Sequence, residues 1–63
     1  MEKKIISELI EDFASMIGLP LEENDIENIY VVYEEKKFAS DIQSILLTEL
    51  YAIQKERVES QVL

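Results

Sequence analysis

The chain of 63 residues contains no cysteine, histidine or tryptophan, and its 6 basic and 14 acidic residues give a formal net charge of −8. The absence of thiol and imidazole groups excludes disulfides, the usual zinc sites and most nucleophile–base pairs. The negative charge disfavours direct binding to nucleic acid, whose phosphates require clustered Lys and Arg. We therefore expect a single small domain over residues 1–63, without enzymatic activity, cofactor or metal.

The distribution of apolar residues gives no sign of a membrane protein. No apolar run approaches the ~20 residues that a membrane helix requires. Glu8, Glu11 and Asp12 interrupt the N-terminal segment, so it does not resemble a signal peptide. We expect a cytoplasmic protein that acts without a membrane, a nucleic acid or a small-molecule substrate as its partner.

The first predicted element is a helix over residues 2–17. Its apolar residues recur at helical spacing and share one face. Gly18 follows the last of them, where a left-handed residue often ends a helix, and Pro20 prevents simple continuation. Residues 18–24 are therefore predicted to be a connection.

The second element, over residues 25–36, fits two structures. Its Ile-Tyr-Val-Val-Tyr run at residues 29–33 favours a strand, but a lone strand over residues 28–34 would need to pair across a dimer. Since no second strand is visible in the sequence, a helix capped by Asn24 or Asp25 is the preferred prediction.

The third element is predicted to be a helix over residues 40–58 that begins at Ser40 or Asp41, with residues 59–63 frayed. The fold class is therefore all-α, a small three-helix unit that we expect dimerisation to complete. The main apolar stripe of this last helix consists of Phe38, Ile42, Ile45, Leu46, Leu50 and Ile53.

The third helix has more apolar surface than one neighbouring helix covers. Leu47, Tyr51 and Val58 lie beside the main stripe, and a helix with so wide an apolar face is normally buried on two sides. They either wrap a three-helix core or contact a partner. That partner is a foreign protein or a second subunit, most simply in a two-fold dimer. The predicted partner or dimer surface is Leu47, Leu50, Tyr51 and Val58.

Acidic residues form two further features. Glu22, Glu23, Asp25 and Glu27 are either a docking patch for a basic partner or cap and dipole chemistry on a solvated turn. Glu49 and Glu56 lie one heptad apart at the rim of the main stripe. They either extend into water or pair with Lys55 and Arg57 of an antiparallel copy.

Together these features predict a small acidic protein-interaction module. It would act as a regulator, adaptor, chaperone or inhibitor by binding a partner protein, and we expect it to be a homodimer. One alternative is a mimic of nucleic acid that inhibits a DNA- or RNA-binding protein. The other alternative is a structural subunit of a larger assembly.

Overall fold

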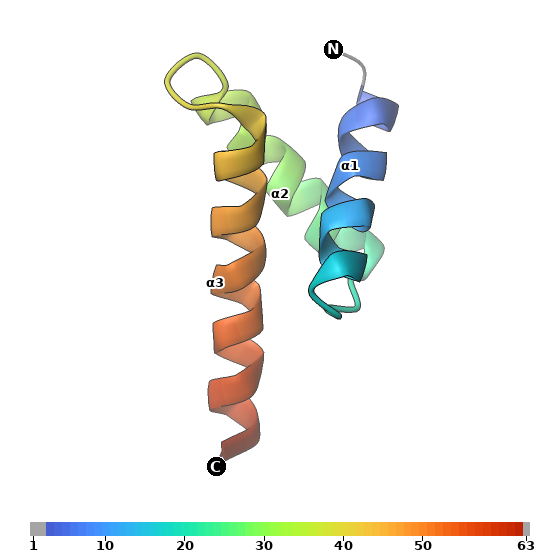
Figure 1. Cartoon of the computed structure of the whole chain (residues 1–63), viewed down its shortest axis with the longest axis vertical. Helices are drawn as coiled ribbons and strands as arrows, with labels where there is room; N and C mark the ends of the chain where they lie inside the picture. Colours follow the sequence, from blue (N-terminus) through green and yellow to red (C-terminus); the bar gives the residue numbers. More distant parts are fainter. Residues whose placement is uncertain (1–2, 63) are drawn as a thin grey trace.

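The computed structural model describes the backbone of residues 3–62 and the side chains of residues 3–60. This part of the chain contains three α-helices, α1 (Lys3–Met16), α2 (Glu23–Lys36) and α3 (Ile42–Val62), and it contains no strand (Figure 1). The prediction of an all-α, three-helix fold is confirmed. Helix α2 crosses behind α1 and α3 in Figure 1 and packs against both of them.

The middle segment is a helix, so the alternative of a strand over residues 28–34 is wrong. Ile29 and Tyr33, one helical turn apart, are both buried in the core of the protein. Burying this face against two other helices outweighs the preference of its β-branched and aromatic residues for a strand. Val31 points away from the core and is 54% exposed.

A glycine ends α1 as the sequence predicts. Gly18 has a φ of 69°, in the left-handed region that glycine adopts without strain. Its N–H donates to the Ser15 carbonyl at 3.1 Å, and the N–H of Leu19 donates to the Ala14 carbonyl at 2.8 Å. These two bonds form a Schellman motif, which turns Leu19 back into the core.

The N-terminus of α2 differs in detail from the prediction. Its N-cap residue is Glu22, so the assignment of Asn24 or Asp25 to this position is wrong. Asp25 instead lies at the third helical position, where its Oδ2 atom accepts a hydrogen bond of 3.0 Å from the N–H of Glu22. This is one half of a capping box, and it fixes the direction in which the chain enters α2.

Asp41, one of the two residues predicted to begin the last helix, caps α3. The Oδ1 atom of Asp41 accepts a hydrogen bond of 3.0 Å from the backbone N–H of Ser44. The hydroxyl group and the N–H of Ser44 hold the pKa of the Asp41 carboxyl below its ordinary value. The helix continues to Val62, four residues beyond its expected end. Fraying of residues 59–63 stays a prediction, and residue 63 lies outside the described part.

The core is formed by one face of each helix together with Leu19, which follows the glycine that ends α1. Phe38, expected in the main stripe of the last helix, is 92% exposed in the α2–α3 connection, because α3 begins only at Ile42. Among the described residues, no helix is long and apolar enough to cross a membrane. The buried residues are Ile6, Ile10, Ala14, Leu19, Ile29, Tyr33, Ile45, Leu46 and Leu50.

Candidate functional site

The candidate site is the outer face of α3, which we define as Leu47, Tyr51 and Val58. At 3.6 residues per turn these three residues lie within about 40° of one another, and about 140° around the helix from the mean direction of its core residues. Tyr51 is 52% exposed, Val58 is 55% exposed and Leu47 is half-buried. Helix α3 thus contributes one apolar face to the core and presents a second one to solvent.

Leu50, the fourth residue of the predicted surface, is not on this face. Its side chain is completely buried in the core, one helical turn after Leu46, which is also completely buried. Leu50 therefore stabilises the three-helix unit and cannot contact a partner while the unit is folded. The surface predicted from the sequence is reduced to its other three members.

The outer face continues onto a part of α3 that extends beyond the rest of the molecule. In Figure 1 the C-terminal turns of α3 pass the end of α1 and leave the other helices behind. No residue of α3 from Tyr51 to Ser60 is buried, and residues 58–60 are all exposed. The helix is therefore longer than its own core needs.

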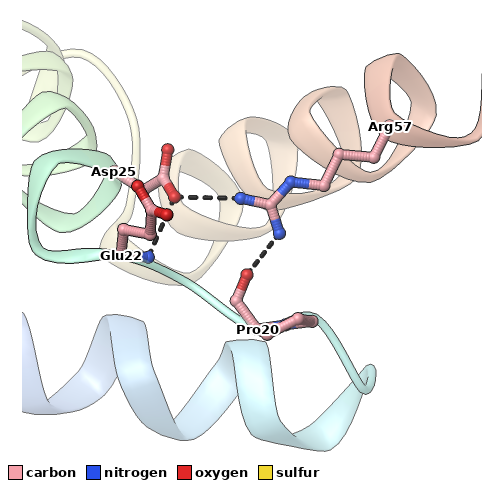
Figure 2. Close-up of polar contacts among 4 residues, drawn as sticks. All are labelled: Pro20, Glu22, Asp25 and Arg57. Carbon is pink, nitrogen blue, oxygen red and sulfur yellow. Dashed lines mark hydrogen bonds and ion pairs between the residues drawn. The ribbon is translucent and has the colours of Figure 1, made fainter. Parts of the chain in front are cut away.

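Two side chains connect this extended part of α3 to the α1–α2 connection and to the first turn of α2. Gln54 Nε2 donates a hydrogen bond of 3.4 Å to the carbonyl of Ile17. The Arg57 guanidinium donates to the Pro20 carbonyl and, at 2.9 Å, to Oδ2 of Asp25. Figure 2 shows the guanidinium held between these two acceptors. The same Asp25 oxygen also accepts the N–H of Glu22, so one carboxylate joins the α2 cap to α3.

This arrangement gives Arg57 a role that the sequence did not suggest. Arg57 contacts residues of its own chain, whereas the sequence offers it as a partner for Glu49 or Glu56 of an antiparallel copy. In the structure Glu49 is half-buried and Glu56 is exposed. Arg57 and Asp25 are 32 residues apart, and no local pattern marks such a pair.

Removing the Arg57 side chain should loosen α3 without unfolding the protein. Arg57→Ala deletes bonds to a carboxylate and a carbonyl, but the guanidinium is partly exposed to water. We therefore expect a loss of about 1 kcal/mol in the free energy of unfolding. For a domain of this size, such a loss lowers Tm by roughly 4–8 °C in thermal denaturation followed by circular dichroism. Lys55→Ala is the control, because Lys55 is exposed and has no ion pair among the described residues. Equal Tm values for the two variants would contradict the role of Arg57.

The predicted acidic patch is divided by intramolecular ion pairs. Asp25 binds Arg57, and Glu27 Oε1 lies 2.6 Å from Lys3 Nζ. Within the described residues, Glu22 and Glu23 are the members of the patch that have no ion pair, and both are exposed. Half of the expected docking charge is therefore already paired within the chain.

Of the other two tyrosines, Tyr33 belongs to the core and Tyr30 packs against it. Tyr33 is buried and Tyr30 half-buried, with ring centroids 6.3 Å apart, and Lys3 Nζ lies 5.6 Å from the Tyr30 centroid. Tyr51, by contrast, is on the surface. In the described part of the chain, no polar side chain is buried and no acidic residues are grouped so as to hold a metal ion. The outer face of α3 therefore remains the candidate site.

Comparison with known proteins adds no assignment to this geometry. No protein-family model, no curated protein and no solved structure matches the chain.

Proposed function

We propose that this chain works by binding protein, with the outer face of α3 as its contact surface. Its role would be that of a regulator, adaptor, chaperone or inhibitor that occupies the surface of a partner. The observation that supports this proposal is the exposure of Tyr51 and Val58 beside Leu47, on a helix whose other face already completes the core. Homodimerisation through the same face is part of the proposal.

The grouping of these side chains distinguishes them from ordinary surface residues. Single exposed apolar residues are normal on soluble domains and need no explanation. Here the others are scattered, with Val31 on α2, Phe38 in a connection, and Ile5 and Met16 near opposite ends of α1. The residues of the outer face follow one another along a single helix, and tyrosine is enriched among the residues that dominate binding energy.

Mimicry of nucleic acid has weaker support from the described residues. A mimic needs rows of carboxylates that are available to a basic partner, and two of the four acids at the start of α2 are already paired with Arg57 and Lys3. A structural subunit of a larger assembly would use an apolar surface of the same kind. That alternative differs from the leading proposal in the partner and in the permanence of the contact.

Capture of interacting proteins on the immobilised chain tests the proposal when it is combined with two matched variants. Tyr51→Asp places a charge on the outer face of α3, and Val31→Asp makes the same kind of change at a residue of similar exposure on α2. We expect a protein bound by the unmodified chain and by Val31→Asp to be lost from Tyr51→Asp. Retention of every bound protein by Tyr51→Asp would contradict the proposal.

The salt dependence of the captured complex distinguishes binding through the apolar outer face from binding by mimicry of nucleic acid. Binding through an apolar face should survive an increase in ionic strength, because it owes little to exposed charges. Binding by charge mimicry should fall steeply, since salt screens exposed charges beyond a Debye length of about 8 Å at physiological ionic strength. A complex that dissociates in moderate salt would favour the mimic.

A further inference from the structure

The outer face of α3 is the centre of a longer line of residues with heptad spacing. Ser44, Leu47, Tyr51, Gln54 and Val58 follow one another at alternating intervals of three and four residues. This is the spacing by which a helix meets a second helix along a seam. Within one chain the seam has no other helix to meet, because the residues of α3 that are buried against α1 and α2 lie on its other side. Gln54 reaches from the edge of the seam to the Ile17 carbonyl in the α1–α2 connection.

The charges on α3 leave this seam accessible to a second acidic chain. At about 100° per residue, the half of α3 that is centred on the seam contains one charged residue among those described, Lys55. Glu49, Glu56 and Glu59 lie outside that half of the helix. Two chains with a net charge of −8 repel each other in general. When two chains meet along this seam, the described carboxylates of one α3 do not face those of the other α3.

The order of residues along the seam fits a copy of itself that runs in the opposite direction. Leu47 and Val58 are equally distant from the midpoint between residues 52 and 53, and so are Tyr51 and Gln54. A two-fold axis at that midpoint places Leu47 of each copy against Val58 of the other copy. It also places Tyr51 of each copy against Gln54 of the other, so that apolar residues meet apolar ones and polar groups meet polar ones.

We infer that the occupant of the outer face is a second copy of this chain, paired antiparallel along α3 about this midpoint. The inference rests on the proposed function, because it names the partner of the same face. Gln54 Nε2 already bonds the Ile17 carbonyl, so its Oε1 atom is the acceptor for the Tyr51 hydroxyl of the second copy. Lys55 then lies beside Thr48 of the second copy.

Three physical differences favour antiparallel over parallel pairing. A parallel pair would stack Gln54 on Gln54, whereas the antiparallel pair gives each Gln54 a hydroxyl donor. Antiparallel helices also oppose their macrodipoles. Finally, each C-terminal part of α3, which extends past the other helices in Figure 1, lies beside the N-terminal half of the other α3.

The area of the seam limits the strength of this dimer. From Leu47 to Val58 the helix rises by only about 16 Å. Three apolar residues over that length bury much less than the roughly 800 Å² per partner of a standard interface. The dimer is therefore reversible, and it exchanges with a monomer whose core is complete.

Disulfide trapping tests the pairing in a chain that has no cysteine of its own. Leu47→Cys and Val58→Cys chains are mixed in equal amounts under mild oxidation, and the products are separated by mass. We expect the mixed disulfide to form at least about tenfold faster than either homodimer, because antiparallel pairing raises the effective concentration of the two thiols. Val31→Cys is the control, since its face of α2 is outside the seam. It should react with both variants at the slow rate, and circular dichroism verifies that all three variants are folded.

Two results would overturn the inference. Faster homodimers of Leu47→Cys and of Val58→Cys would show parallel pairing, and rates equal to that of the Val31→Cys control would show that the copies do not pair here. If the rates are equal but Tyr51→Asp still loses a captured protein, a foreign protein occupies the face. In that case the self-pairing fails, and with it the homodimer of the proposed function, while the binding of a foreign protein through the outer face of α3 stands.

Discussion

Leu50→Ala is expected to reduce the free energy of unfolding by about 3 kcal/mol, whereas Tyr51→Ala, at the next residue, should change it by less than about 0.5 kcal/mol. The side chain of Leu50 is completely buried among the three helices, and its truncation leaves a cavity. Tyr51 is half exposed on the outer face and supports no core residue. Urea denaturation followed by circular dichroism measures both values, at a protein concentration low enough to keep the chain monomeric.

The size of the protein makes the first of these changes severe. Domains below about 70 residues rarely have more than 3–5 kcal/mol of stability from one core. Leu50→Ala should therefore be largely unfolded at physiological temperature, whereas Tyr51→Ala should keep the helical signal of the unmodified chain. Equal losses in the two variants would contradict the division of α3 into a core face and an outer face.

Tyr51→Asp is expected to weaken self-association by roughly 100-fold or more. In a two-fold dimer each substitution occurs twice, and each one replaces the Tyr51 ring by a carboxylate that loses water in the contact, with Lys55 at the edge of the seam as the nearby cation. A cost of about 1.5 kcal/mol for each copy gives a total of about 3 kcal/mol, which corresponds to this change in Kd. Sedimentation equilibrium over a range of concentrations measures Kd for the unmodified chain and the variant.

Val31→Asp is the control for this measurement, because it adds the same charge at a residue of similar exposure on α2. Its Kd should stay close to that of the unmodified chain. Added salt should tighten the dimer of the unmodified chain, because it screens the repulsion between two copies of charge −8. A similar weakening by both substitutions would show that charge rather than the outer face of α3 controls association.

Much of the fold is predictable because its signals are local. Gly18 ends α1 because an αL position favours glycine, and Asp41 starts α3 because a carboxylate can accept a free N–H at a helix end. The middle segment is ambiguous in the sequence, since its residues favour a strand while its spacing allows a helix. The structure makes it a helix because Ile29 and Tyr33 bury one face between two other helices. That outcome depends on partners that a local window does not contain.

The parts of the site that the sequence did not predict depend on long-range contacts. Asp25 lies in a run of acids that suggests a docking patch, but it binds Arg57, 32 residues away, together with the cap of its own helix. Phe38 matches the period of the last helix, yet it precedes the start of that helix and is exposed. Leu47, Tyr51 and Val58 could be separated from the core stripe by helical period alone, and that separation holds in the structure for these three residues.

We propose that the outer face of α3 is a contact surface that the core of the monomer does not need. Amide chemical shifts of the labelled chain, recorded from micromolar to millimolar concentration, test this proposal residue by residue. We expect concentration-dependent shifts along α3 at Leu47, Tyr51, Gln54 and Val58, while the amides around Val31 in α2 stay constant. Shifts concentrated at Val31, or an absence of shifts at every concentration together with unchanged protein capture by Tyr51→Asp, would contradict it.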